Sequence, residues 1–476
     1  MPASARLIPL IIASALFMEN MDSTVIATSL PAMAKDLGTD AIVLKLAFTT
    51  YLLSLAVFIP ISGWMADRFG ARHVFRIAIL VFTLGSIACG LATSLGGLVA
   101  ARALQGVGGA MMVPVGRIIL LRSIPTSELV DALAWLTIPA LIGPLLGPPI
   151  GGFITDSFGW RWIFWMNVPF GIGAIVFATL LMPETGVDHV PPLDLKGFLL
   201  SGLGLSSLIF GLTVLGRDLL PGYLPTVLVV FGLFMSGLCV AHARNVPAPI
   251  LDLRLLRIET FKAGVIGGSL FRLGVGAVPF LLPLMFQIGY GMSAFQSGLI
   301  TCVAAAGAIA MKFGAARMIR RFGFRRLLLI NGILASASIS IMGLLSAATP
   351  YVIAAALLFA GGFLRSLQFT AMNAMSYSDI GNDEASHATG LYTVAQQLSL
   401  SAGVVLAAFV LEAALWWRSE TVLQPADFTL AFFTVAIFSL AATWQFRSLS
   451  FDAGSSVAGL RNKISHAEVT KPPADV

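Results

Sequence analysis

GWMADRFGARHVFR, residues 63–76, is matched in the second half of the chain by ARMIRRFGFRRLLL, residues 316–329. Both stretches contain Arg-Phe-Gly followed by basic residues, and the two copies lie 253 positions apart. Each copy follows the second apolar run of its half of the chain. Similarity between two halves is a sequence signature of membrane folds that are built from structural repeats. The two stretches therefore predict two related halves.

The composition is that of a protein embedded in a lipid bilayer. Of the 476 residues, 57% are hydrophobic and 11% are charged, and the mean hydropathy is +0.91. Soluble domains carry roughly 25% charged residues. Runs of about 20 apolar residues predict membrane-spanning helices. Fourteen such runs lie near residues 8–30, 42–64, 74–94, 97–120, 130–155, 160–182, 197–216, 223–242, 262–283, 291–313, 326–347, 350–372, 388–412 and 427–446.

These runs divide the chain into four parts of an all-α membrane protein. We expect a six-helix bundle at 1–182 and a second six-helix bundle at 262–446. Two inserted helices with their flanking loops occupy 183–261, and a tail occupies 447–476. The offset of 253 residues between the repeated stretches explains the insertion, because it leaves six spans on either side.

Basic residues predict the direction in which the chain crosses the membrane. With the N-terminus inside, the inner segments hold 21 of the 29 Lys and Arg residues, the outer loops hold five and the spans hold three. Cytoplasmic loops of membrane proteins carry an excess of Lys and Arg. We therefore expect both termini in the cytoplasm and an uncleaved first span. The same distribution explains the isoelectric point near 9.4 without a nucleic-acid partner.

Ionisable side chains within the spans mark the candidate site. Glu19 and Asp22 lie three residues apart, hence on one helical face, and Asp22 lies in the outer half of its span, as does Arg102. Such residues are costly in a bilayer and usually face a bundle interior or a wet pathway. Desolvation favours the protonated form of a carboxyl group, so Asp22 is a candidate for proton exchange. The approach or withdrawal of Arg102 would determine when Asp22 releases its proton. The alternative is a static ion pair that fixes helix register.

Two further arginines, Arg272 and Arg365, lie deep in the ninth and twelfth spans. The offset of 253 residues places Arg272 at the position equivalent to Glu19. The deep charges thus fall on the first and fourth spans of each half. This clustering predicts a central pathway lined by those four helices.

Several classes of function lack support in the sequence. The three cysteines lie in apolar runs, and the five histidines have no metal-ligand spacing, so we expect neither disulfides nor a metal site. No Lys is followed by Ser or Thr, which excludes the phosphate-binding loop of an ATP-driven pump. No nucleophile–base constellation is present. We therefore expect a protein that is not an enzyme and that holds no cofactor.

Four motifs resemble those of the major facilitator superfamily, specifically its fourteen-span drug:proton antiporters of the EmrB/QacA type. The likeness covers nearly the whole chain. It rests on MDSTVIATSLP at 21–31, GWMADRFGARH at 63–73, RALQGVGGAMMVPVGR at 102–117 and GPLLGPPIGG at 143–152. The last motif has no copy at the offset of 253 residues, where the sequence is QQLSLSAGVV. Its glycines also allow an interpretation as simple helix packing.

The resemblance implies roles for individual residues. Asp22 looks like the proton-coupling carboxylate, Arg102 takes part in proton transfer, and Glu19 is a substrate contact or second proton site. The loop motif implies a conformational latch, in which Gly63 permits close helix approach; Arg320 replaces the acid of this motif in the second copy. The remaining latch residues are Asp67, Arg68 and Arg72, and the antiporter motif supplies Gly143, Pro144, Gly147, Pro148, Gly151 and Gly152.

The resemblance also implies alternating access coupled to protons, in the bacterial inner membrane, by a monomer. The leading hypothesis is an exporter of hydrophobic, cationic drugs or toxic compounds, as in antibiotic resistance. An exporter or proton symporter of an anionic or zwitterionic metabolite is one alternative, and a non-transporting receptor or assembly subunit is another. Some members of the resembled group use a periplasmic adaptor, which no loop here identifies. Residues that we expect to line the substrate cavity are Glu19, Gln105, Trp135, Arg272, Arg365 and Asn373.

Overall fold

The computed structural model describes residues 3–123, 129–182, 192–214, 221–246, 249–381, 384–450 and 453. Within these ranges the chain forms helices and turns and no strand. The first group of helices comprises α1 (Ala3–Asp36), α2 (Lys45–Phe69), α3 (Ala71–Leu91), α4 (Leu95–Ser123), α5 (Leu129–Phe158), α6 (Trp162–Trp165) and α7 (Asn167–Leu181). An inserted pair follows, α8 (Leu195–Val214) and α9 (Leu224–Asn245).

The second group begins with a helical unit that contains two π turns. It consists of the 3₁₀ turn η2 (Leu253–Arg257), α10 (Glu259–Lys262), the π turn η3 (Ala263–Gly267), α11 (Gly268–Leu284) and the π turn η4 (Met285–Gly289). The helices that follow are α12 (Ala294–Lys312), α13 (Ala315–Phe322), α14 (Phe324–Met342), α15 (Tyr351–Ser376), α16 (Ala385–Arg418) and α17 (Pro425–Arg447).

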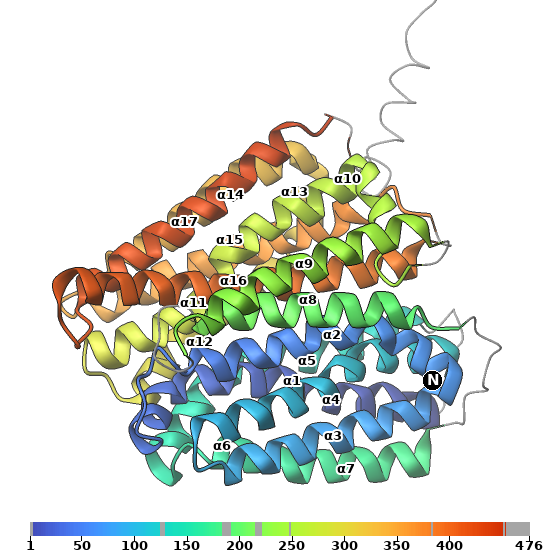
Figure 1. Cartoon of the computed structure of the whole chain (residues 1–476), viewed down its shortest axis with the longest axis horizontal. Coiled ribbons are helices and arrows are strands. Elements are labelled where there is room, and N and C mark those ends of the chain that lie inside the picture. The colour runs from blue at the N-terminus through green and yellow to red at the C-terminus, as the bar shows by residue number, and fades with distance from the viewer. Residues whose placement is uncertain are drawn as a thin grey trace, which may run out of the picture.

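Thirteen helical segments of the described chain are long and apolar enough to cross a membrane. The remaining predicted span, 130–155, the fifth along the chain, corresponds to α5, of which the side chains of residues 129–141 are not described. The helices run side by side across Figure 1, with α3 and α7 at one edge and α14 and α17 at the other. We call the side where α1 begins and α17 ends the terminal side, and the opposite side the far side. Each span crosses from one to the other.

The repeated stretches adopt the same turn in both halves. Gly70 joins α2 to α3 with φ 85°, and Gly323 joins α13 to α14 with φ 70°. A positive φ is strained for residues that carry a Cβ, so glycine is required at both turns. The second copy differs in one respect, because the short helix α13 precedes its turn as a separate element. The similarity seen in the sequence is therefore a similarity of backbone conformation.

Two seams join the groups of helices, one between α5 and α12 and the other between α2 and α16. At the first seam Gly152 of α5 faces the backbone of Ala294, and a Cβ on Gly298 of α12 would lie 2.6 Å from the carbonyl carbon of Pro148. Only glycine permits backbones to approach so closely. At the second seam Lys45 Nζ lies 2.7 Å from Glu412 Oε1.

Further contacts join the groups on the far side. Gln287 donates to the carbonyl oxygen of Thr28, and the backbone N–H of Phe295 donates to Asp156. The side chains of Lys45 and Glu412 are 3% and 14% exposed, so this pair is largely removed from water. These contacts close the far side of the molecule in this conformation.

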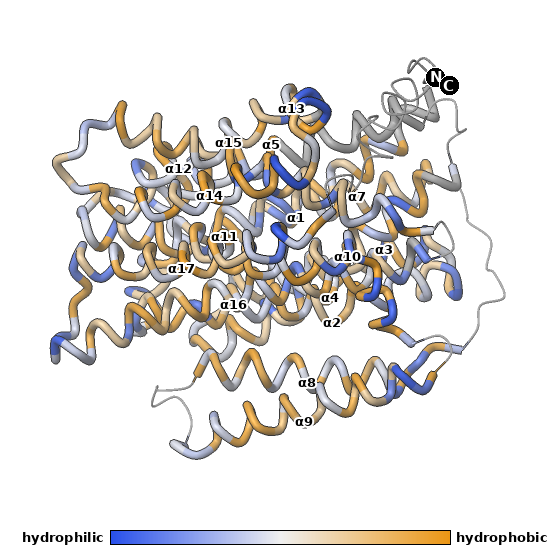
Figure 2. The backbone as a smooth tube through the Cα atoms, turned by 90° about the horizontal axis from the view of Figure 1, so that it is seen from above, coloured by the Kyte–Doolittle hydropathy of each residue, from blue (hydrophilic) through white to orange (hydrophobic). Residues whose placement is uncertain are grey.

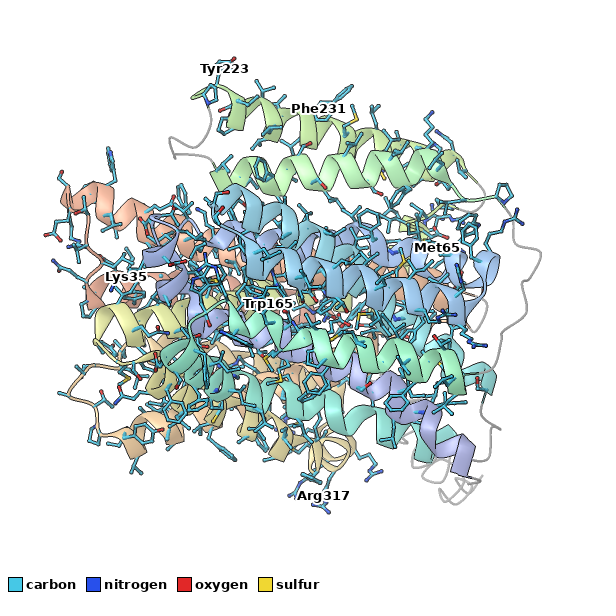
Figure 3. The ribbon with its side chains drawn as sticks, turned by 90° about the horizontal axis from the view of Figure 1, so that it is seen from below. Lys35, Met65, Trp165, Tyr223, Phe231 and Arg317 are labelled. Atoms are coloured by element: carbon cyan, nitrogen blue, oxygen red, sulfur yellow. The ribbon has the colours of Figure 1, made fainter. Side chains whose placement is uncertain are left out.

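The inserted helices pack on each other and lie along one edge of the molecule, as Figure 2 shows. α8 contacts both α2 and α16, and Phe198 of α8 meets Phe58 of α2 with ring centroids 5.8 Å apart. α8 thus covers the second seam. α9 forms the outer layer, where Tyr223 and Phe231 stand at the edge of Figure 3.

Asp194 anchors the start of α8. It accepts hydrogen bonds from the backbone N–H groups of Gly197 and Ile250, and its Oδ1 lies 2.8 Å from His242 Nε2 of α9. Burial alone would raise the pKa of Asp194, but the hydrogen bonds from His242, Gly197 and Ile250 outweigh it and lower the pKa. The inserted pair is therefore tied together on the terminal side.

The observed helices depart from the predicted spans mainly at their ends. The first span, predicted at 8–30, is a helix from Ala3 to Asp36, because hydrogen bonding within a helix continues beyond the apolar residues that the bilayer requires. The sixth span, predicted as one run at 160–182, is one apolar helical segment from Trp162 to Leu181, in which Met166 between α6 and α7 keeps helical φ −61° and ψ −26°. Asn167 begins α7, and its side chain lies inside the bundle.

Candidate functional site

Asp22 of α1 and Arg102 of α4 form a buried ion pair. Arg102 Nη1 lies 2.6 Å from Asp22 Oδ2, and the two side chains are 0% and 1% exposed. Arg102 Nε also donates to the carbonyl oxygen of Ala47, and its guanidinium lies 4.4 Å from the ring centroid of Tyr51. Contacts from α1 and α2 therefore hold the guanidinium in place.

Two amides complete the environment of Asp22. Its Oδ1 accepts hydrogen bonds from Gln105 Nε2 at 2.9 Å and from Asn167 Nδ2 at 2.8 Å. The hydroxyl oxygen of Ser86 on α3 accepts from the same two amides, at 2.6 and 3.1 Å. Asp22 thus has three donors from two helices, and both of its oxygens are satisfied.

The sequence did not reveal Ser86 and Asn167. Each is one polar residue within an apolar run, and such residues are common in helices of every kind. Asn167 lies 145 positions from Asp22, so no spacing rule connects them. The only signal was the polarity of Asn167 inside a predicted span.

Glu19 lies one helical turn from Asp22, near the middle of α1, and its environment is different. Its Oε2 is buried and has no hydrogen-bond partner among the residues that the structure describes. The hydroxyl of Tyr51, likewise buried, also lacks a partner within this set. A buried carboxyl group without a partner is costly when charged. Of the two acids, Glu19 is therefore the one that keeps an oxygen without a partner among the described residues.

Glycines of α5 hold this helix against the face of α1 that carries Asn20, Thr24 and Val25. A Cβ on Gly143 would lie 3.1 Å from Cβ of Asn20, and one on Gly147 would lie 3.0 Å from Cβ of Thr24. A Cβ on Gly151 would lie 2.7 Å from Cγ1 of Val25. Three glycines spaced by four residues thus form one contact surface.

The other motif residues of α5 face elsewhere. Gly152 and the backbone of Pro148 contact α12 in the other group of helices. Pro144 lies on the same helix, partly buried. The motif therefore places α5 between the helix that carries Glu19 and Asp22 and the seam with the second half.

The predicted latch residues lie around the turn between α2 and α3, at the terminal side. A Cβ on Gly63 would meet no atom within 4 Å, so the expected close helix approach does not occur there in this conformation. Asp67 is partly buried, Arg68 is exposed, and Arg72 donates to the carbonyl oxygen of Thr179 on α7. This hydrogen bond of Arg72 joins two helices of the first group.

Arg272 and Arg365 lie near the middle of their spans in the second half. Arg272 is fully buried, and its Nη2 donates to the hydroxyl of Tyr392. Arg365 is 8% exposed and directs Nη1 toward the sulfur of Met342 on α14, at 3.6 Å. Neither forms an ion pair with a carboxylate of the described chain.

The other predicted cavity residues are dispersed. Gln105 is fully buried, and its amide is occupied by Asp22 and Ser86, so it offers no free donor to a ligand in this conformation. Asn373 is exposed near the terminal end of α15. The side chain of Trp135 lies outside the described residues. The structure therefore gathers Glu19, Asp22, Arg102 and Gln105 and leaves Asn373 apart.

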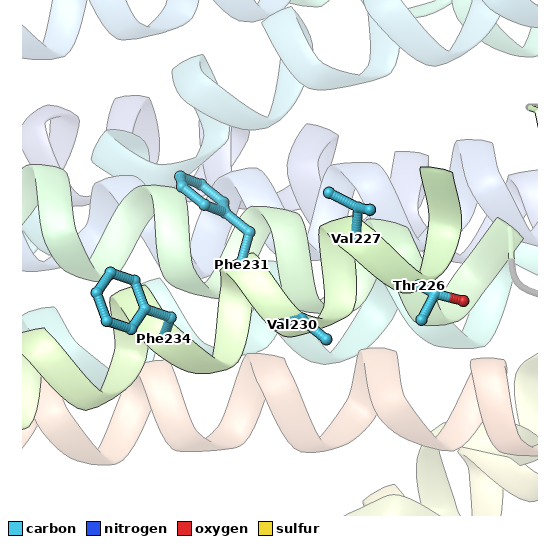
Figure 4. Close-up of a pocket in the computed structure, with 5 residues that line it drawn as sticks. All are labelled: Thr226, Val227, Val230, Phe231 and Phe234. Atoms are coloured by element: carbon cyan, nitrogen blue, oxygen red, sulfur yellow. The ribbon is translucent and has the colours of Figure 1, made fainter. Parts of the chain in front are cut away.

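A shallow apolar depression lies on α9, as Figure 4 shows. Its lining, which holds no charged residue, consists of Thr226, Val227, Val230, Phe231 and Phe234. Because α9 is the outermost helix, this depression suits a lipid chain and is remote from the charged cluster. The described residues also contain no group of His, Cys, Asp and Glu side chains that would hold a metal ion.

Comparisons with known proteins agree with this arrangement. The family model of the Major Facilitator Superfamily matches residues 12–404 and 265–455. A relative from Klebsiella pneumoniae, with the provisional name multidrug resistance protein MdtD, is 37% identical over 98% of this chain and 99% of its own. Its counterpart in an Escherichia coli K12 strain is 37% identical over 86% of this chain and 87% of its own.

Solved structures share the fold at low sequence identity. A D-xylose–proton symporter superposes with a TM-score of 0.68 at 14% identity, covering 94% of this chain and 98% of its own. The POT family transporter PepTSo gives a TM-score of 0.68 at 15% identity, covering 96% and 98%. Two related groups of helices, an inserted pair and a buried charge cluster on the first helix are thus accompanied by a match over nearly the whole chain. The protein belongs to the Major Facilitator Superfamily, a family of membrane transporters.

Proposed function

We propose that the protein is a proton-coupled antiporter that exports hydrophobic, cationic compounds by alternating access. The observation that carries this proposal is the contrast between two acids on one face of α1. Asp22 is neutralised by Arg102 and two amides, whereas Glu19 keeps a buried oxygen without a partner among the described residues. The multidrug resistance names of the relatives favour the same class of substrate.

In this mechanism Glu19 accepts either a proton or the positive charge of the substrate. Both would neutralise a buried carboxylate, so they compete, and competition for one site is sufficient for antiport. The assignment differs from the sequence expectation that Asp22 couples transport, because Asp22 already has a full set of partners. Asp22 and Arg102 instead fix the position of α1 and the field around Glu19.

The free energy for export would come from the proton gradient. A charge that crosses the membrane potential contributes roughly 2.3 kcal/mol per 100 mV. The far side is closed here by the α5–α12 backbone contacts and the Lys45–Glu412 pair. We propose that this conformation receives substrate from the terminal side. The basic residues counted above favour a cytoplasmic terminal side in a bacterial inner membrane.

The test is a proton-flux assay with the full chain in liposomes. A pH gradient is imposed, a lipophilic cation such as tetraphenylphosphonium is added, and an internal dye reports the pH. Wild type should release protons when the cation is added, and Glu19→Gln should abolish this release. Asp22→Asn should reduce it. Flux that persists in Glu19→Gln but disappears in Asp22→Asn would return the coupling role to Asp22.

A second candidate, transport of an anionic or zwitterionic metabolite, is favoured by Arg272 and Arg365. Both are buried without a carboxylate partner in the described chain. A panel of anions in the same assay separates the two candidates. If no compound of either charge changes the internal pH, the protein is a receptor or an assembly subunit.

A further inference from the structure

The guanidinium of Arg272 has unused hydrogen-bonding capacity. Its Nε and Nη1 are buried and have no hydrogen-bond partner among the described residues. Its one hydrogen bond to a side chain runs from Nη2 to the hydroxyl of Tyr392. Arginine offers five N–H donors in a planar fork that matches the two oxygens of a carboxylate or phosphate. Arg272 thus has donors available for a bidentate acceptor.

Aromatic rings from α15 and α16 surround this guanidinium. Its Cζ lies 4.5 Å from the ring centroid of Tyr392 and 5.7 Å from that of Phe369. Tyr377, at the terminal end of α15, meets Tyr392 with ring centroids 5.5 Å apart and ring planes tilted by 57°. Cation–π contacts orient a guanidinium and partly compensate its burial. They supply no acceptor to Nε and Nη1, so the rings position Arg272 without satisfying these two groups.

The backbone of α11 makes room for the same group. A Cβ on Gly268 would lie 2.7 Å from Arg272 Nη1 and 3.3 Å from its Cζ. The missing side chain lets Arg272 fold back along its own helix toward the terminal side. The π turn η3, Ala263–Gly267, lies directly before this position. Turns of this kind occur frequently at functional sites.

Arg272 differs from Arg102 in having no counter-charge. Arg102 is paired with Asp22 at 2.6 Å, whereas the groups that act electrostatically on Arg272 are two tyrosines, Tyr392 and Tyr377. A buried charge without a partner is strongly unfavourable. A purely structural position would be filled at lower cost by an apolar residue. The retained charge points to a partner that is not part of the chain.

The position of Arg272 relates it to Glu19. Each lies near the middle of the first spanning helix of its half, at equivalent places in the repeat, and α1 contacts α11. Tyr377 and Tyr392 cover Arg272 from the terminal side. On the same side Arg117 of α4 is exposed and close enough to Tyr377 to interact with it electrostatically. One further basic group, Arg117, therefore lies near the tyrosines that cover Arg272, on the side from which substrate would enter.

We propose that Arg272, supported by Tyr392 and Phe369, binds an anionic group of the transported compound. The preferred substrates are then amphoteric, with a cationic end at Glu19 and a carboxylate, sulfonate or phosphate at Arg272. The rings of Tyr377 and Tyr392 move aside to admit the anion. This inference rests on the proposed function for the role of Glu19 and adds the class of substrate.

The experiment compares two dyes that differ by one charge. A rhodamine with a free carboxylate is amphoteric, and its ethyl ester is a cation of nearly the same size. Binding of each to the purified full-length protein in detergent is followed by fluorescence polarisation, without a proton gradient. Wild type should bind the free acid more tightly than the ester. Arg272→Gln should weaken binding of the free acid about tenfold to a hundredfold and leave the ester unchanged.

Two further variants keep the result interpretable. Arg272→Lys retains the positive charge but not the planar set of N–H donors, so part of the preference for the free acid over the ester should be lost. Arg244→Gln removes an exposed arginine on α9, outside both halves, and should bind both dyes as wild type does. Size-exclusion profiles and melting temperatures show whether each variant is folded. Equal weakening of both dyes in Arg272→Gln, or no effect on either, would overturn the proposal.

Transport of the same dyes separates this inference from the proposed function. If both dyes drive proton flux that depends on Glu19, but Arg272→Gln does not discriminate between them, the anion subsite is wrong and the antiporter stands. If neither dye drives such flux while Arg272→Gln still weakens the free acid selectively, the subsite stands and proton coupling fails. Displacement of the free acid by an anionic phospholipid, but not by benzoate, would assign the site to a lipid and overturn the proposal.

Discussion

The first helices of the two halves carry opposite solutions to the same problem of burying charge in a membrane. On α1 and α4, the Asp22–Arg102 pair is neutral as a unit, and both oxygens of the acid are satisfied. On α11, Arg272 is equally buried and has no carboxylate partner in the described chain. The first arrangement stabilises the bundle, whereas the second leaves a charge to be neutralised from outside. A repeat in the backbone therefore does not imply a repeat in chemistry.

The largest expected effect comes from breaking the complete pair. Arg102→Met leaves Asp22 charged, buried and without its main partner, and we expect a loss of about 3–5 kcal/mol in the free energy of unfolding. Thermal or denaturant unfolding in detergent measures this loss. The double variant Arg102→Met/Asp22→Asn removes both charges and should recover most of it. A single variant as stable as wild type would show that the pair carries no net charge coupling.

The next prediction concerns the Lys45–Glu412 ion pair, which joins the two halves of the molecule. The Asp22–Arg102 pair, by contrast, lies within the first half. Lys45→Met removes the contact with Glu412 on the far side, so we expect the closed far side to open more often. Labelling of Ala294→Cys by a membrane-impermeant maleimide should accelerate about tenfold, which corresponds to a shift of about 1.4 kcal/mol. The exchanged pair Lys45→Glu/Glu412→Lys should restore the slow rate. Unchanged labelling in Lys45→Met would mean that the α5–α12 backbone contacts suffice for closure.

Substitution of one glycine in each of two motifs should change the free energy of unfolding in opposite directions. Gly147→Ala places a Cβ 3.0 Å from Cβ of Thr24, where α5 packs on α1, and should cost about 1–3 kcal/mol. Gly63→Ala meets no atom within 4 Å and should stabilise α2 by about 0.5–1 kcal/mol. The melting temperatures of both variants measure these two changes in stability. Similar destabilisation at the two sites would contradict the packing described for this conformation.

The smallest expected effect on stability is that of substituting Arg272, which has no carboxylate partner in the described chain, in contrast to Arg102. Arg272→Met removes an unpaired charge, so the loss of its ring contacts, about 0.5–2 kcal/mol, is offset by the relief of burying a guanidinium. We expect the free energy of unfolding to fall by less than about 1 kcal/mol, or to rise. A loss as large as that of Arg102→Met would reveal a structural partner for Arg272. It would also remove the basis for an external anion.

Much of the architecture was predictable because the bilayer acts locally along the chain. The apolar runs, the Arg-Phe-Gly repeat and the inserted pair all follow from the sequence, and α5 corresponds to the fifth run. Helix ends were less predictable, as the extension of α1 to Asp36 shows. Hydrocarbon thickness limits only the buried part of a helix.

The sequence by itself determined which residues are anomalous in a membrane. Glu19, Asp22, Arg102 and Arg272 stand out because charge is costly in hydrocarbon wherever the chain folds. The sequence also indicated that the glycines of α5 are packing positions, since tight helix packing requires small residues at a fixed spacing.

The tertiary structure alone decided how these residues are satisfied. Asn167 reaches Asp22, and Lys45 reaches Glu412 across 367 positions, because helix packing brings them together. Packing likewise left Glu19 and Arg272 with unpaired atoms within the described chain. A sequence shows which charges are present. Whether each one is neutralised depends on atoms within about 3 Å, and that distance is set by the fold.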